Sequence, residues 1–127
     1  MVEAKDIKNI FTDYVISSDE PEGSRQTIAI CDHENADLRV ECTLTDNVLT
    51  EVYFLNNQFY EQESDVLLQA ARDIVEGNYT VKSNFFKSKQ WIMPESLRGV
   101  QSELQRQASQ PINYCQDLLT RNRLPKE

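Results

Sequence analysis

The chain has 127 residues, which fits one domain and is too short for two ordinary ones, so we expect a single domain over residues 1–127. A hydrophobic content of 39% and a charged content of 27% exclude a disordered chain, and no run reaches the roughly 20 apolar residues of a membrane-spanning helix. The net charge of −8 is unevenly divided: residues 1–76 hold seventeen Asp/Glu and five Lys/Arg, whereas residues 77–127 hold four and eight.

The first predicted element is an amphipathic helix near the N-terminus. Four apolar residues follow the i, i+3, i+4, i+7 spacing that places side chains on one side of a helix: Ile7, Ile10, Phe11 and Tyr14. The residues after it are polar and include Pro21 and Gly23, so we predict a loop over residues 19–24.

Three strands are predicted next, over residues 27–31, 38–44 and 48–55, because their apolar residues are β-branched or alternate with polar ones. A two-residue loop at Asp46 and Asn47 would place Glu51 opposite Cys42 on the apolar side of the hairpin. Burying a lone carboxylate is costly, so we predict a three-residue loop that pairs Leu44 with Val48. The three strands would form an antiparallel meander.

A helix that packs on this meander is predicted to follow. Ser64 is a favourable N-cap residue, and Gly77 stands where a left-handed C-terminal residue is wanted. The apolar residues between them form one broad side of a helix: Val66, Leu67, Ala70, Ala71, Ile74 and Val75.

The last third gives weaker patterns. Residues 79–85 alternate as a fourth strand would, and residues 91–93 suit either a short strand or a loop. Pro94 and Pro111 each suit the start of a helix, the first ending near residue 108, and residues 124–127 are expected to be frayed. The predicted fold is therefore α+β: an N-terminal helix, a three-stranded antiparallel meander, a packed helix, an uncertain extended segment and two C-terminal helices.

Catalytic and metal-binding motifs are not evident. Four polar residues between two predicted strands form a weak metal candidate, Asp32, His33, Glu34 and Asp37, but a solvated loop explains them better. They lack the glycine bend of a calcium loop and the additional Cys or His ligands of a zinc site, so we predict no metal and no cofactor. Cys31, Cys42 and Cys115 suit buried positions, where a reactive thiolate is suppressed.

Residues 79–93 mix aromatic and basic side chains, and no acidic residue occurs between Gly77 and Pro94. Aromatic residues anchor protein interfaces, and the same mixture can stack on bases and contact phosphates. The weak candidates for partner binding are Tyr79, Lys82, Phe86, Lys87, Lys89 and Trp91. The alternative is that the aromatic rings pack in the core and the lysines face water.

These observations favour a non-catalytic cytoplasmic protein that binds another protein, in which an acidic surface would suit a basic partner. An inhibitor, an immunity-type protein and a chaperone-like protein all fit this description, and a homodimer stays open. Size, acidity and element order are loosely similar to those of small bacterial secretion chaperones, although no motif supports membership and the predicted helical C-terminal third differs. The alternatives are a small enzyme or ligand-binding domain with a site assembled by the fold, and nucleic-acid binding through residues 79–93, which the overall negative charge disfavours. No membrane partner is predicted.

Overall fold

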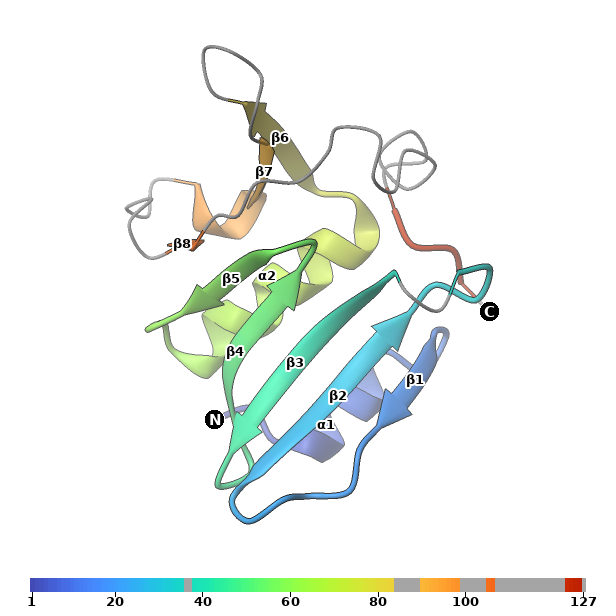
Figure 1. Cartoon of the computed structure of the whole chain (residues 1–127), viewed down its shortest axis with the longest axis vertical. Coiled ribbons are helices and arrows are strands. Elements are labelled where there is room, and N and C mark those ends of the chain that lie inside the picture. Colours follow the sequence, from blue (N-terminus) through green and yellow to red (C-terminus); the bar gives the residue numbers. More distant parts are fainter. Residues whose placement is uncertain (36–37, 84–89, 99–104, 107–122, 127) are drawn as a thin grey trace.

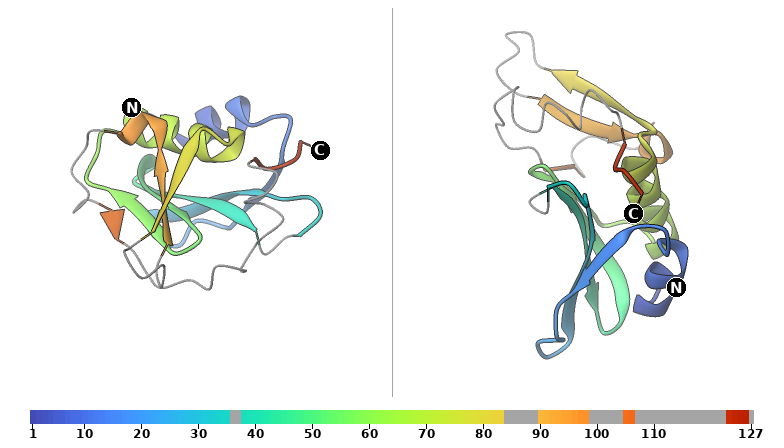
Figure 2. Two further views of the ribbon diagram at one scale, coloured as in Figure 1. Left: turned by 90° about the horizontal axis from the view of Figure 1, so that it is seen from above. Right: turned by 90° about the vertical axis from the view of Figure 1, so that its right-hand side faces the viewer.

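One antiparallel sheet with both α-helices on the same face organises the molecule (Figures 1 and 2). The computed structural model describes residues 1–35, 38–83, 90–98, 105–106 and 123–126. The sheet has six strands in the order β1-β2-β3-β4-β5-β8, and β6 and β7 form a second, two-stranded sheet. The strands are β1 (Val15–Ser18), β2 (Arg25–Cys31), β3 (Arg39–Thr45), β4 (Val48–Phe54), β5 (Asn57–Tyr60), β6 (Tyr79–Ser83), β7 (Gln90–Pro94) and β8 (Gln105–Arg106); the helices are α1 (Ala4–Ile10) and α2 (Ser64–Glu76). None of the described helices is long and apolar enough to span a membrane.

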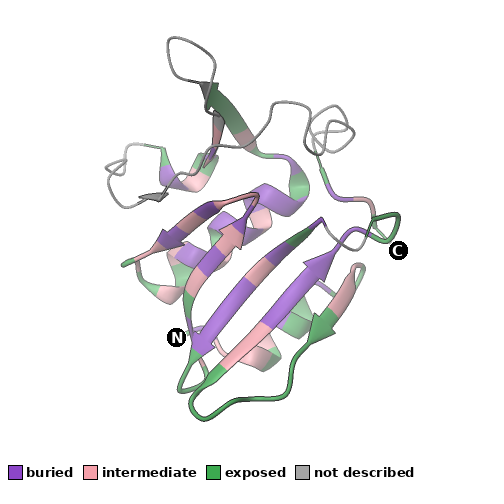
Figure 3. Cartoon of the chain, viewed as in Figure 1, coloured by how far each residue is buried: buried purple, intermediate pink, exposed green. Residues whose placement is uncertain are grey.

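The hydrophobic core lies between the sheet and the two helices (Figure 3). Alternate residues of the central strands point to this side, so their apolar side chains meet those of the helices. The buried residues of this layer include Ile28, Ile30, Val40, Cys42, Leu44, Val52, Phe54 and Phe59 from the sheet, and Ile7, Leu67, Ala70 and Ile74 from the helices.

The predicted fold is α+β as expected, but its element list is wrong. The three predicted strands correspond to β2, β3 and β4, and β1, β5 and β8 extend this meander on both sides. The turn into β5 was missed because Leu55, an unusual turn residue, adopts a positive φ of 47° together with Asn56 at 63°. Positive φ at both central residues is typical of the two-residue turn that suits the twist of a hairpin.

The N-terminal helix is shorter than predicted, because it ends at Ile10 and the chain turns into β1. Ile7 and Phe11 are buried as the helical spacing predicts, whereas Ile10 is 40% exposed. Val15 and Ile16 are β-branched and suit the pleated surface of a strand, and Ile16 packs against the core from β1.

The predicted register of the β3–β4 hairpin is also wrong. Asp46 and Asn47 form a two-residue turn with φ values of 49° and 61°, and Leu44 pairs with Leu49. The register then shifts by one residue, which leaves Thr50 as a β-bulge and pairs Cys42 with Val52. The bulge turns Glu51 to the opposite face, so the short loop buries no lone carboxylate.

Helix α2 follows the prediction closely. The N-cap residue is Glu63 and not Ser64 as predicted, so the helix begins at Ser64 itself. The Ser64 hydroxyl instead accepts a hydrogen bond from Val2 N–H at 2.9 Å. The predicted left-handed Gly77 is confirmed, with φ 82°, and its N–H donates to the carbonyl oxygens of Asp73 and Ile74. The C-terminal end of α2 also holds the end of the chain: Leu124 is 1% exposed, and its N–H donates to Val75 O at 3.0 Å.

Residues 79–83 and 90–94 are both strands, which decides between the strand and loop alternatives for these segments. The helix predicted from Pro94 to residue 108 is wrong, because only a single 3₁₀ turn, Glu95–Leu97, follows before Arg98 becomes extended. Buried Asp73 accepts Ser96 N–H at 2.8 Å and so ties this turn to α2. The last helix, predicted from Pro111, lies outside the described residues.

Candidate interaction surface

The face of the main sheet opposite α1 and α2 is covered by no described helix or strand (Figure 2). We call it the outer face and define it by the residues that the register places there: Val15, Ser17, Arg25, Thr27, Ala29, Cys31, Arg39, Glu41, Thr43, Thr45, Val48, Glu51, Tyr53, Gln58 and Tyr60. One row crosses the sheet through Ala29, Glu41, Tyr53 and Gln58, and the next through Thr27, Thr43, Glu51 and Tyr60.

The long side chains of the outer face are held by contacts within it. The Arg39 guanidinium lies with Nε 3.0 Å from Glu41 Oε1, and Gln58 Nε2 donates to Glu51 Oε1 at 3.5 Å. The Tyr53 hydroxyl donates to the side-chain oxygen of Asn56 in the turn before β5. These contacts limit the rotamer freedom that a partner would otherwise have to remove on binding.

The outer face presents two tyrosine rings among polar and short side chains. Tyr53 and Tyr60 are half-buried, so each presents a ring surface between polar neighbours, and tyrosine is enriched at protein interfaces. Ala29, Cys31 and Thr43 on the same face have short side chains and are buried. The sequence did not indicate this face, because β5, which supplies Gln58 and Tyr60, was not recognised; the Asn56-Asn57 pair was the available signal for its turn.

The structure separates the predicted partner-binding residues of 79–93. Lys82 and Trp91 are direct cross-strand neighbours on one side of the β6–β7 hairpin. Tyr79 instead packs against the core, where burial raises the pKa of its hydroxyl to about 12. Phe86, Lys87 and Lys89 lie outside the described residues.

The weak metal candidate is a loop in which Asp32 has a structural contact. Asp32 is buried, and its Oδ1 accepts Glu34 N–H at 2.8 Å, the pattern of an Asx turn. His33 Nε2 lies 3.9 Å from Glu34 Oε1, with both side chains partly exposed, and Asp37 lies outside the described residues. Among the residues that the structure describes, no group of three His, Cys, Asp or Glu side chains is arranged to hold a metal ion.

The described cysteines are poor nucleophiles. Cys31 and Cys42 are free thiols, and both are buried. Burial, with a smaller effect of the Glu41 carboxylate, raises the pKa of the Cys42 thiol to about 12, so it is un-ionised at neutral pH. Cys115 lies outside the described residues.

A hollow of about 720 Å³ lies beside the C-terminal end of α2. It is lined by Tyr14, Glu76, Asn78, Arg123, Leu124, Pro125 and Lys126. Burial, followed by the Glu76 carboxylate, raises the pKa of the Tyr14 hydroxyl, so Tyr14 offers a neutral hydrogen-bonding group there.

The acidic residues do not gather on one face. Asp19, Glu20 and Glu22 lie in the loop between β1 and β2, whereas Glu41 and Glu51 lie on the outer face. Glu63 and Asp65 lie at the start of α2, in the opposite layer.

No protein-family model matches this chain, and comparison with curated proteins and with solved structures found no match.

Proposed function

We propose that the chain is a non-catalytic domain that binds another protein through the outer face. One observation supports this proposal: among the described residues, no helix or strand packs on the outer face of the six-stranded sheet. That face presents Tyr53 and Tyr60 among polar side chains that contact one another. A sheet face of this kind offers a flat surface with aromatic anchors and a polar surround, as interfaces do.

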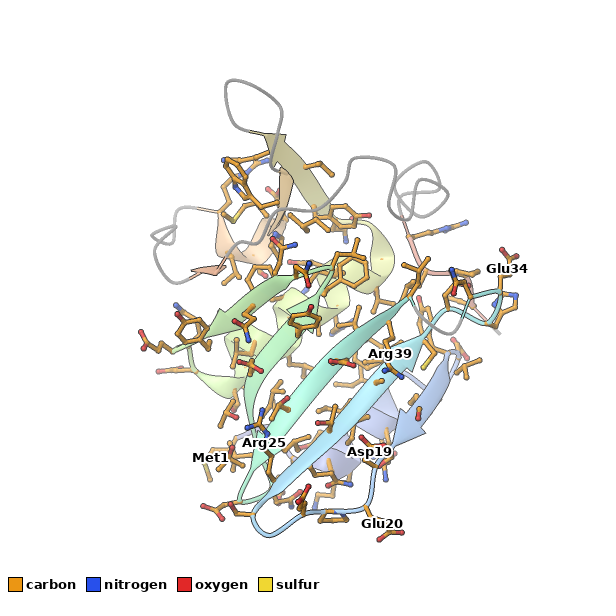
Figure 4. All side chains as sticks on the ribbon, in the orientation of Figure 1. Met1, Asp19, Glu20, Arg25, Glu34 and Arg39 are labelled. Atoms are coloured by element: carbon orange, nitrogen blue, oxygen red, sulfur yellow. The ribbon has the colours of Figure 1, made fainter. Side chains whose placement is uncertain are left out.

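The charge of the chain favours a basic partner. On the outer face Glu41 and Glu51 are balanced by Arg25 and Arg39. The negative excess comes from the loop between β1 and β2, which holds Asp19, Glu20 and Glu22; Figure 4 shows Asp19 and Glu20 at the lower edge of the sheet. Acidic surfaces accelerate encounter with basic partners and make the binding salt-dependent. An inhibitor, an immunity-type protein or a chaperone-like protein of the cytoplasm would use such a surface, and the free thiols of Cys31 and Cys42 suit a reducing compartment.

Affinity capture with paired variants tests the proposal. The double variant Tyr53→Ser/Tyr60→Ser removes both rings, and Trp91→Ser is the matched control because it removes a half-buried ring from the other sheet. We expect a stoichiometric protein to be recovered with the wild type and with Trp91→Ser, and lost with the double variant. Recovery of the same protein by the double variant, or of no stoichiometric protein by the wild type, contradicts the proposal.

A small-ligand function is the second candidate, and the hollow at the end of α2 favours it. Arg123 and Lys126 supply two cations against the one carboxylate of Glu76, and Tyr14 and Asn78 supply neutral polar groups, so a carboxylate-bearing small molecule would suit the lining. Titration with acetate and with succinate, followed by NMR, should shift the resonances of Tyr14 and Arg123 together. Unchanged resonances at both residues would remove this candidate.

Nucleic-acid binding through residues 79–93 remains a further prediction. Lys82 beside Trp91 combines a cation with a stacking surface, although the net charge of −8 repels a polyanion at long range. Charge reversal at Lys87 and Lys89 tests it with single-stranded DNA and RNA. Binding that is unaffected by the reversal would exclude this segment as the contact.

A further inference from the structure

The strand β1 forms one border of the main sheet (Figure 1). It pairs with β2 from Val15 opposite Cys31 to Ser18 opposite Ile28, and no described strand pairs with its other side. An unpaired strand border presents backbone N–H and C=O groups in the geometry that a further strand can use.

The register identifies which backbone groups point outward. Asp19 N–H donates to Thr27 O at 3.1 Å, which makes these two residues a hydrogen-bonded pair of the antiparallel ladder. Such pairs alternate along the ladder, so Ser17 and Val15 also direct their backbone groups to β2. Ile16 and Ser18 therefore direct their N–H and C=O groups to the open border.

Apart from its short length of four residues, the open border lacks the devices that usually prevent strand addition. Residues 15–18 read Val-Ile-Ser-Ser, with no lysine, proline or charged residue, and their pairing with β2 contains no bulge. The side chains alternate, so Val15 and Ser17 lie on the outer face while Ile16 packs against the core.

Carboxylates stand at both ends of this neutral segment. Asp13 precedes β1, and Asp19, Glu20 and Glu22 follow it, with Asp19 and Glu20 at the lower end of the sheet in Figure 4. Arg25 lies in the same group, so this end keeps a negative excess. Lys126 Nζ lies 4.0 Å from Asp13 Oδ2, but both side chains are well exposed, so this pair is weak. A strand with a neutral centre and basic ends would therefore complement the border in charge.

We propose that the β1 border binds an extended segment of the partner protein, with a neutral β-branched centre and Lys or Arg at its ends, as an additional strand of the sheet. This inference rests on the proposed protein-binding function and names the chemistry of the partner. The backbone groups of Ile16 and Ser18 supply the main-chain hydrogen bonds, and the flanking carboxylates select the basic ends. A second copy of this chain is disfavoured, because antiparallel addition of β1 to β1 brings the acidic ends of the two copies together.

The added strand would also widen the outer face. Alternate side chains of the partner segment would lie beside Val15 and Ser17, in line with the row that continues through Ala29 and Glu41 to Tyr53. Strand addition and docking on the outer face therefore use one continuous surface.

Two synthetic peptides test the inference directly, Lys-Lys-Thr-Val-Thr-Val-Lys-Lys and its counterpart with glutamate in place of every lysine. Amide hydrogen exchange and NMR titration of the full chain report where each peptide binds. We expect only the lysine-flanked peptide to bind, with slowed exchange at Ile16 and Ser18, the two outward N–H groups. Equal affinity for both peptides, or protection confined to other elements, overturns the inference.

Proline supplies the variant for the backbone contact. Ser18→Pro removes an outward N–H and leaves the bonds of Ser17 to β2 in place, whereas Ser18→Ala keeps the N–H and serves as the control. Because the donor is lost and the ring obstructs the approach, we expect Ser18→Pro to weaken peptide binding at least about tenfold, and Ser18→Ala by less than about twofold. Unchanged affinity in a folded Ser18→Pro variant contradicts strand addition.

A charge variant covers the case in which Ser18→Pro does not fold. In Asp19→Lys/Glu20→Lys we expect the preference to move toward the glutamate-flanked peptide, and an unaltered preference contradicts the proposed charge selection.

The outcomes of these experiments also distinguish a failure of strand addition from a failure of the proposed function. If the captured protein is lost with Tyr53→Ser/Tyr60→Ser but retained by Ser18→Pro, the strand-addition inference fails and the proposed function stands. If no protein is captured while the lysine-flanked peptide binds at β1, the proposed docking on the outer face fails, and the ability of the β1 border to accept a strand is all that stands.

Discussion

Asn57 Oδ1 accepts the backbone N–H of Ile92 at 3.1 Å, and this contact joins the second sheet to the β4–β5 hairpin. The same side chain donates through Nδ2 to Phe54 O at 3.1 Å and to Leu55 O at 2.9 Å. Asn57 is 3% exposed, so the backbone groups that it satisfies have little access to water. One amide thus holds both the turn that creates β5 and the position of β7.

We expect Asn57→Ala to lower the free energy of unfolding by about 2–4 kcal/mol, because it leaves buried backbone groups without these partners. Gln58→Ala is the matched control: Gln58 is the next residue of β5, and among the described residues its side chain makes only the 3.5 Å contact with Glu51. We therefore expect this variant to lose less than about 1 kcal/mol. Urea denaturation of both variants measures the difference. Equal losses of unfolding free energy in the two variants would show that the Asn57 side chain does not stabilise the contact between β5 and β7.

We predict opposite effects on stability for Tyr79→Phe and Tyr53→Phe, because the two hydroxyls differ in their hydrogen bonding. The Tyr79 hydroxyl is buried and has no hydrogen-bond partner among the described residues, whereas the Tyr53 hydroxyl donates to Asn56. We expect Tyr79→Phe to raise the free energy of unfolding by up to about 1 kcal/mol and Tyr53→Phe to lower it by about 1 kcal/mol. Thermal and urea unfolding of the pair give the signs, and a clear loss in Tyr79→Phe would reveal a partner for that hydroxyl.

The raised pKa of Tyr79 also predicts a pH dependence. Burial raises this pKa from 10.0 to about 12, so the folded state holds the proton more tightly than the unfolded state does. The stabilisation is complete below pH 10 and is lost as the pH rises from about 10 to about 12. Urea unfolding across this range should show a falling stability with a smaller slope in Tyr79→Phe, although Cys42 contributes a loss of the same sign. An identical slope in the variant would contradict the assignment.

Elements were predicted correctly where their own residues show a clear pattern. Helix α2 carries a wide apolar side and a terminal glycine, and strands β2 to β4 show alternation or β-branched runs, so each was found. β1 was missed because Val15 and Ile16 follow directly on a helical spacing, and β5 because Leu55 stands at a turn position that rarely accepts it. The hairpin register failed because a bulge at Thr50 cannot be deduced from pairing rules that assume a regular ladder.

The candidate surface was harder to predict than the fold. Tyr53 and Glu41 become neighbours through the register of β3 and β4, and Tyr60 joins Glu51 only through β5. The predicted aromatic and basic segment contains one neighbour pair, Lys82 and Trp91, but its Tyr79 packs against the core instead. The position of the proposed interface depends on pairings between distant residues, which composition does not reveal.

The left-handed end of α2 gives a prediction on backbone conformation. Gly77 has φ 82°, a region in which a Cβ atom is strained, and asparagine tolerates that region better than alanine does. We expect Gly77→Ala to lower the free energy of unfolding by about 1 kcal/mol or more, and Gly77→Asn by a smaller amount. If both substitutions cost the same, the left-handed conformation is not the cause of the loss.

The buried thiol of Cys42 predicts a difference in reactivity between the folded and unfolded chain. Cys42 is 0% exposed and its pKa is raised to about 12, so at pH 8 the folded protein presents neither access nor thiolate to an alkylating reagent. We expect iodoacetamide to leave Cys42 unmodified in the folded protein and to modify it fully in guanidinium chloride, as read by peptide mass spectrometry. The unfolded sample is the control, because there the thiol regains its ordinary pKa. Modification at equal rates in both samples would mean that β3 opens to solvent far more readily than a central strand of a six-stranded sheet should.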